Sequence, residues 1–337
     1  MSILSTAPLG VAPPDSAIGS IYIMAAIVAL LAAFATGLLR KNAVSGPSRL
    51  PASDRAAWRL LFALACGFMM WITVQIIYGG FMQLRTGPST RTVASTQLTF
   101  SPLDWAFLST VPYAIGFLTL LTTDAFLLDG AAGIERLGLR SHPLGGAMRG
   151  VVGILIAWPM VQIVSAVSEQ AYDRFHFVHP QEHELLKALG ESGNPAVRIA
   201  LIVGAVIFAP LFEEYVFRAH IQTFLREMLI RATRPRKETV EPQTGDIPDS
   251  RTLAYAVPGR TAWEAPRSIA WPTWVAIFIA SAIFTSVHPR WMWPPIFFLA
   301  ICLGYAYERT GNLWTTIVMH SLFNAINTAA YLSLGHG

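Results

Sequence analysis

Long apolar stretches recur along almost the whole chain, and no other feature restricts its fold as strongly. A helix needs about 20 mostly apolar residues to cross the hydrocarbon core of a bilayer. We predict eight membrane-spanning helices, near 18–39, 58–82, 103–128, 146–168, 196–218, 270–288, 292–308 and 312–334. The fifth could extend to about residue 230, and the seventh is short. The sequence therefore predicts an all-α, polytopic membrane protein.

The composition excludes a soluble globular domain. Of the 337 residues, 53% are hydrophobic and only 13% are charged, whereas a soluble domain carries about 25% charged residues. No basic amphipathic helix or aromatic–basic stretch suggests nucleic acid, so the lipid bilayer is the expected partner. Cys66 and Cys302 lie in predicted spans and are expected to be buried apolar thiols rather than a disulfide or a metal site.

Lys and Arg residues are unevenly distributed among the connections between the spans. The first, third and fifth connections together carry 13 Lys and Arg residues, against 5 in the second, fourth and sixth, and the fifth, 231–268, is the richest. The positive-inside rule places these connections in the cytoplasm and both termini outside. Because residues 1–17 contain no Lys or Arg and Arg40 and Lys41 follow the first apolar stretch, we interpret that stretch as a retained span rather than a secretory signal.

Two connections are long enough to have features of their own. The segment 231–268 is rich in Pro and charge, and it is predicted to be a mobile cytoplasmic loop. The segment 170–195 contains leucines at helical spacing, which predicts a short surface helix. His179 and His183 in this segment match the HxxEH pattern of inverse zincins. We favour a capped surface helix over a zinc site there.

Three charged residues interrupt the apolar fifth span: Glu213, Glu214 and Arg218. Ionisable residues within membrane helices are usually functional. Glu214 and Arg218 are four residues apart and can pair on one helix face, whereas Glu213 is rotated from Glu214 by about 100°. Glu213 is thus a candidate general acid or base. The spacing alone is equally consistent with a structural role, in which the three residues form an ion network between helices.

Polar residues in two later spans complete the candidate set. Phe284 and His288 are one helical turn apart at the end of the sixth span. His320, Asn324 and Asn327 share one stripe of the eighth span. These side chains could bind a developing oxyanion, or they could simply join helices by hydrogen bonds.

In chain order, three motifs resemble those of the CAAX prenyl protease and bacteriocin-processing (CPBP, also called ABI) intramembrane protease family. They are Glu213-Glu214-x-x-x-Arg218, Phe284-x-x-x-His288 and His320-x-x-x-Asn324, with the flanking sequences FEEYVFRAHIQ, GYAYERTGNLW and MHSLFNAIN. The resemblance covers roughly 144–335. We therefore divide the chain into an N-terminal three-span region, 1–143, and a protease core, 144–337.

The resemblance implies a role for each matched residue. Glu213 is the expected catalytic carboxylate and activates a water together with His288, while His320 and Asn324 are expected to stabilise the oxyanion. The expected supporting residues are Glu214, Arg218 and Phe284. Members of the family are often called metalloproteases, and Glu213, His288 and His320 could hold zinc. We favour a mechanism without a metal because no HExxH motif is present and Glu213 with His288 suffices for it.

The resemblance predicts an endopeptidase whose substrate is a membrane-embedded or lipidated peptide, of CAAX type or a leader peptide. Two alternatives are a non-proteolytic scaffold or self-immunity protein of the same fold, and a proton-coupled transporter. A transporter is disfavoured because the chain shows no internal repeat.

The depth of Glu213 in the membrane is a difficulty for this prediction. If the fifth span ended at residue 218, Glu213 and His288 would lie at opposite ends of their helices. Shifting the span to roughly 205–228 moves Glu213 outward by about 13 Å. The sequence leaves these two boundaries open.

Overall fold

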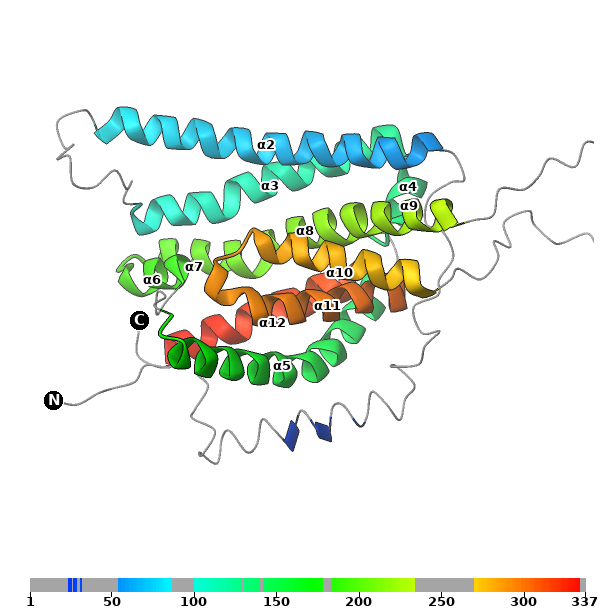
Figure 1. Cartoon of the computed structure of the whole chain (residues 1–337). Helices are drawn as coiled ribbons and strands as arrows, with labels where there is room; N and C mark the ends of the chain where they lie inside the picture. The colour runs from blue at the N-terminus through cyan, green and yellow to red at the C-terminus, as the bar shows by residue number, and fades with distance from the viewer. Residues whose placement is uncertain are drawn as a thin grey trace, which may run out of the picture.

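The chain folds into a bundle of helices, shown in Figure 1, and the part that the structure describes contains no strand. This computed structural model describes residues 54–86, 100–128, 130–139, 142–177, 183–233 and 270–333, with a few positions between 24 and 31. The all-α prediction is confirmed. The predicted first span, 18–39, falls almost entirely outside the described residues, as do His179 and nearly all of the loop 231–268.

The described helices of the first part of the chain are α2 (Asp54–Thr86), α3 (Pro102–Leu127), α4 (Ala131–Arg136), α5 (Pro143–Arg174) and α6 (Glu184–Glu191). The later ones are α7 (Pro195–Val203), η2 (Gly204–Phe208), α8 (Ala209–Glu214), η3 (Tyr215–Gln222), α9 (Thr223–Thr233), α10 (Ala270–Ser286), η5 (Arg290–Met292), α11 (Trp293–Thr310) and α12 (Leu313–Ser333). Here η2 and η3 are π-helical, and η5 is a 3₁₀ turn.

Four helical stretches are long and apolar enough to cross a membrane: Arg55–Arg85, Pro102–Leu127, Pro143–Arg174 and Pro195–Thr233. The helix Trp271–Ser286 is apolar but shorter. α11 and α12 run alongside these helices in the same bundle (Figure 1). The architecture is that of an integral membrane protein with several spans.

The fifth predicted span is a single continuous helix of 39 residues, Pro195–Thr233. The alternative in which this span ends at residue 218 is therefore wrong. Asn194 caps the helix by accepting a hydrogen bond from the backbone N–H of Ala196. Glu213 lies near the middle of the helix, so it is not confined to one membrane surface, and the depth conflict disappears.

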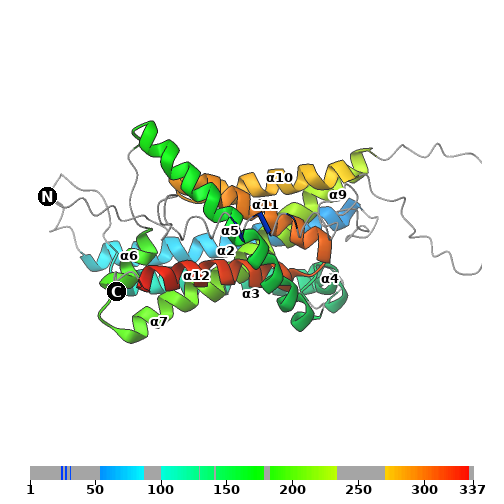
Figure 2. The ribbon, with the colours of Figure 1, turned by 90° about the horizontal axis from the view of Figure 1, so that it is seen from below.

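A row of glycines lets α5 pack closely against α12. Figure 2 shows the two helices crossing obliquely. A Cβ atom added at Gly150 would lie 2.7 Å from the carbonyl oxygen of Thr315, and one added at Gly153 would lie 2.6 Å from the sulfur of Met319. Small residues that let two backbones approach are typical of close contacts between membrane helices. This contact fixes α12, which carries two of the motif residues.

The short helix α6 confirms the helix predicted in the segment 170–195. Its Leu189 is fully buried and packs in a cluster with Ala106 of α3 and Leu201 of α7. The helix is thus docked on the bundle and is not a free surface element. The two cysteines, Cys66 and Cys302, are unpaired and partly buried.

Candidate active site

The two adjacent glutamates of α8 lie in different environments. The side chain of Glu213 is 15% exposed, and that of Glu214 is 0% exposed. π-Helical segments precede and follow α8. Such segments are often found at functional sites, because the wider turn changes which side chains face a neighbouring helix. As predicted from the helical repeat, the two carboxylates point in different directions.

Glu214 joins two helices through its two carboxylate oxygens. Oε2 accepts a hydrogen bond from Nε of Arg218 at 3.1 Å, and Oε1 lies 3.1 Å from Nδ1 of His320. The predicted pairing of Glu214 with Arg218 is present, and Glu214 also contacts the motif histidine of α12. Because a carboxylate only accepts, Nδ1 of His320 is the donor. Glu214 thereby fixes the orientation of this imidazole.

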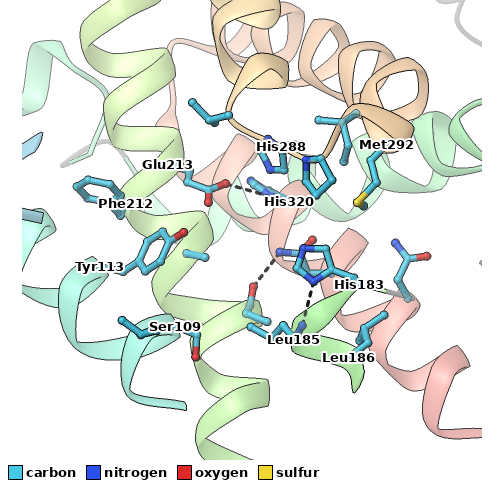
Figure 3. Close-up of a pocket in the computed structure, with 18 of the residues that line it drawn as sticks. Ser109, Tyr113, His183, Leu185, Leu186, Phe212, Glu213, His288, Met292 and His320 are labelled. Atoms are coloured by element: carbon cyan, nitrogen blue, oxygen red, sulfur yellow. Dashed lines mark hydrogen bonds and ion pairs between the residues drawn. The ribbon is translucent and has the colours of Figure 1, made fainter. Parts of the chain in front are cut away.

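The other nitrogen of His320 faces Glu213. Nε2 lies 3.8 Å from Oε2 of Glu213 (Figure 3). That separation is longer than a hydrogen bond but short enough for the two groups to act on one bound molecule. Tyr113 in α3 lines the same cavity, with its hydroxyl group directed toward Glu213 (Figure 3).

His288 lies just beyond the end of α10, and its ring is held by its own backbone. Nδ1 donates a hydrogen bond to the carbonyl oxygen of Phe284 at 2.8 Å, which leaves Nε2 of the neutral imidazole as an acceptor. The ring of Phe284 lies 4.7 Å from that of His288 and 5.8 Å from that of His320, centre to centre. The guanidinium carbon of Arg218 lies 5.3 Å from the centre of the Phe284 ring. Phe284 therefore packs between the two histidines and the arginine.

The asparagines of α12 use their amide groups differently. Asn324 donates from Nδ2 to the carbonyl oxygen of Ala205 in η2 at 2.8 Å, whereas Asn327 donates to Phe323 of its own helix. Asn324 therefore joins two helices, as one of the two interpretations expected. An amide group has a second N–H, so this contact leaves one donor for a ligand.

A cavity of about 620 Å³ brings these side chains together. Glu213, His288, His320 and Asn324 all line it, and Figure 3 shows the first three facing one another across it. Its other walls are mainly apolar and aromatic, and they include Trp71, Tyr113 and Phe212. The cavity extends from the middle of the bundle to the end at which α6 and η5 lie.

Several cavity residues lie outside the motifs and were missed from the sequence. Tyr113 and Trp71 belong to the N-terminal region, and His183 precedes α6. Trp71 stacks on Phe212, the residue before Glu213, at 6.0 Å between ring centres. No sequence pattern distinguishes these aromatic residues from the others in the same spans. His183 is part of the HxxEH match in the sequence, but that match suggested a zinc site shared with His179.

The candidate zinc ligands do not form a metal site in this arrangement. Among the described residues, no group of three or more His, Cys, Asp or Glu side chains is placed to hold a metal ion. The Nδ1 contacts of His320 and His288 leave Nε2 of each ring free, as in metal-binding histidines, but Glu213, His288 and His320 are not placed as such a group although they line one cavity. We therefore derive no step through a metal.

A comparison with protein families identifies the segment that contains the motifs. Residues 195–326 match the family described as type II CAAX prenyl endopeptidase Rce1-like. The predicted family resemblance is confirmed over this segment. It contains all four candidate catalytic residues and begins at the first residue of α7. Searches of the curated proteins and of the solved structures found no match.

The Rce1-like segment does not include every wall of the cavity. α2, α3 and α6 lie before residue 195, and each contributes side chains to the lining. The matched segment thus supplies the four candidate catalytic residues, while the preceding part of the chain supplies much of the aromatic wall together with His183.

Proposed function

We propose that this protein is an intramembrane endopeptidase that hydrolyses a peptide bond of a membrane-associated substrate. The observation that supports this most directly is that Glu213, His288, His320 and Asn324 line one cavity within membrane-spanning helices. A carboxylate and an imidazole that share one water are a suitable general base, and N–H donors nearby are suited to a developing negative charge.

In the proposed mechanism, water binds between the carboxylate of Glu213 and the free Nε2 of His288. Glu213 removes a proton as the water oxygen forms a bond to the carbonyl carbon of the substrate. The resulting oxyanion accepts two hydrogen bonds. One comes from Nε2 of His320 when this nitrogen is protonated, and the other comes from the second N–H of Asn324. The carbon–nitrogen bond then breaks, and the proton on Glu213 passes to the leaving amine. One water is consumed, and a carboxylic acid and an amine are formed.

The supporting residues keep this arrangement rigid. Glu214 holds His320, and Phe284 packs against both imidazole rings. A displacement of about 1 Å at a reacting group can lower a rate by about 10²-fold. We therefore assign Glu214, Arg218 and Phe284 to positioning and not to chemistry.

The substrate is proposed to be a lipidated or membrane-embedded peptide, of CAAX type or a leader peptide. The apolar, aromatic wall formed by Trp71, Tyr113 and Phe212 suits an apolar group next to the scissile bond. The resemblance to type II CAAX prenyl endopeptidases supports a prenylated substrate.

The proposal is tested with purified protein in proteoliposomes and two fluorogenic probes, a farnesylated CAAX-type peptide and a bacteriocin-type leader peptide. Glu213→Gln removes the base and is expected to lower kcat by at least about 10²-fold. The matched control is Glu191→Gln, because Glu191 is an exposed carboxylate on α6 whose contact is with Lys187 at 4.0 Å. Chelator treatment of the same samples should leave the rate unchanged.

Wild-type hydrolysis by Glu213→Gln would refute the role of that residue. If Glu213→Gln and His288→Ala both restored a deletion phenotype fully, and the wild type cleaved neither probe, the scaffold or self-immunity alternative would be correct. Loss of activity with chelator, restored by zinc, would reject the metal-free mechanism.

A further inference from the structure

The first turn of α6 forms part of the cavity wall although it lies outside the Rce1-like segment. His183, Leu185 and Leu186 all line the cavity. The helix is anchored from behind by Ala188 and Leu189, which are buried against α3 and α7. The position of His183 is therefore fixed relative to Glu213 and His288, and Figure 3 shows its ring below theirs in the same cavity.

His183 is the N-cap residue of α6, and the cap fixes the state of its ring. Its Nδ1 accepts a hydrogen bond from the backbone N–H of Leu185 at 3.2 Å. A neutral imidazole that accepts at Nδ1 carries its proton on Nε2. His183 thus offers an N–H donor, and Nε2 has no hydrogen-bond partner among the described residues.

The surroundings of His183 favour this neutral form. Burial lowers the pKa of the imidazole, the nearby His288 lowers it further, and the adjacent Glu184 opposes these effects. Because the net pKa is below the ordinary value, the ring is neutral at pH 7. At this pH its Nδ1 keeps the cap, and its Nε2 keeps the proton.

The hydrogen-bonding capacities of the three cavity histidines are complementary. His288 presents an acceptor, because its Nδ1 is used by Phe284, and His320 presents Nε2 toward Glu213. A peptide that places its scissile carbonyl between Glu213 and the donors of α12 has further main-chain carbonyl groups on either side. His183 offers an N–H donor at the end of the cavity where α6 lies, and no described residue accepts a hydrogen bond from it.

We propose that His183 is a substrate-binding residue whose Nε2–H donates a hydrogen bond to a main-chain carbonyl of the peptide next to the scissile bond. This inference rests on the proposed function for the identity of the ligand as a peptide. It assigns part of substrate recognition to α6, which the family motifs do not include.

Two substitutions separate this role from the capping role. Asn at position 183 can place Oδ1 near the position of Nδ1 and is among the best N-cap residues, but it lacks the distal donor. Gln at position 183 can place its Nε2 near that of the imidazole, but it is a poor cap. His183→Asn should therefore keep the thermal stability and lose the contact with the peptide, while His183→Gln should do the reverse.

We measure the Kd of the fluorescent farnesylated CAAX-type peptide for protein that also carries Glu213→Gln. Binding to this inactive background can be measured without turnover. We expect His183→Asn to raise Kd about five-fold, since a neutral hydrogen bond contributes about 1 kcal/mol, and His183→Gln to keep Kd within about two-fold. The control His176→Asn, an exposed histidine in the same connection, should leave Kd unchanged. Turnover in the wild-type background should show the same differences in KM rather than kcat.

The outcomes distinguish the inference from the proposed function. If His183→Asn binds as the unsubstituted background does and only His183→Gln is impaired, His183 is a capping residue and the inference is overturned. Failure of the peptide to bind at all also overturns it. If binding weakens in His183→Asn but the wild type cleaves no probe, the binding role stands and the proposed hydrolysis fails.

Discussion

At the scale of single residues, Glu214 is the most connected group of the site. It is fully buried, and its carboxylate contacts Arg218 and His320 at the same time. The two terminal nitrogens of Arg218 have no hydrogen-bond partner among the described residues. The charge of Arg218 therefore depends on Glu214, with the face of Phe284 as its other contact.

Glu214→Leu is predicted to be strongly destabilising, because it leaves the buried guanidinium group without a counter-charge. Removing one partner of a buried ion pair lowers the free energy of unfolding by about 3–5 kcal/mol. The double variant Glu214→Leu with Arg218→Met replaces the pair by apolar groups and should recover most of that stability. Its kcat should remain at least about ten-fold low, because His320 has lost the acceptor that orients it.

Thermal unfolding in detergent, together with peptide hydrolysis, gives the double-mutant cycle for this pair. Recovery of stability and of kcat together in the double variant would show that Glu214 acts only through Arg218. In that case, the contact between Glu214 and His320 would have no part in positioning.

At the scale of helices, a buried network fastens the π-helical segment η3 to the last turns of α3. Asp124 accepts a hydrogen bond from the hydroxyl group of Tyr215 at 2.6 Å and lies 3.0 Å from Nε2 of His220. Nδ1 of His220 faces the carbonyl oxygen of Tyr215 at 2.8 Å. The three side chains are fully buried. The N-terminal region thus holds the segment that directly follows Glu214.

Asp124→Ala is predicted to lower both stability and activity, because it leaves His220 and the Tyr215 hydroxyl group buried without an acceptor. The expected loss of unfolding free energy is about 3–5 kcal/mol if the pair is ionic. Asp173→Ala is the matched control, since Asp173 is exposed at the end of α5. Thermal inactivation and kcat are measured for both. Equal behaviour of the two variants would mean that the network does not hold η3 in place.

This network illustrates what the sequence could and could not predict. The fold class and the pairing of Glu214 with Arg218 follow from composition and from the helical repeat, which are local. The contact between Asp124 and His220 joins residues 96 positions apart, and no local pattern encodes it. For the same reason, Tyr113 and His183 were not predicted as neighbours of Glu213 and His288.

The length of the continuous helix Pro195–Thr233 was the other feature that local sequence patterns left open. The prediction ended this span near residue 218 and allowed an extension to about residue 230. The structure continues to Thr233, and the buried Arg226 contacts Thr273 of α10 and Glu308 of α11 and pairs with Glu227 of its own helix. Polar residues can thus lie within a membrane helix when adjacent helices satisfy them.

At the scale of the whole molecule, the cavity reaches the end of the bundle opposite to the helix ends that flank the predicted cytoplasmic connections. Residues of the last turns of α2, the start of α3, the first turn of α6 and η5 line the cavity, so we place its mouth at the end of the bundle where α2 ends and α3 begins, an end that can be followed in Figure 1. The helix ends that flank the predicted cytoplasmic connections, among them the end of α9 and the start of α10, lie at the other end. By the positive-inside rule, the cavity is predicted to open on the non-cytoplasmic side, where it would receive exported or membrane-inserted peptides.

Cysteine labelling in intact cells tests this orientation directly. With Cys66 and Cys302 first replaced by Ala, a single cysteine is introduced at Gly193, near the mouth, or at Glu135 in α4, at the opposite end. Both positions are exposed, and a Cβ atom at Gly193 meets no other atom within 4 Å. A membrane-impermeant maleimide should label Gly193→Cys in intact cells and Glu135→Cys only after lysis. The reverse pattern would place the mouth in the cytoplasm, the side on which soluble prenylated proteins are found, and would show that the charge distribution does not set the orientation of this bundle.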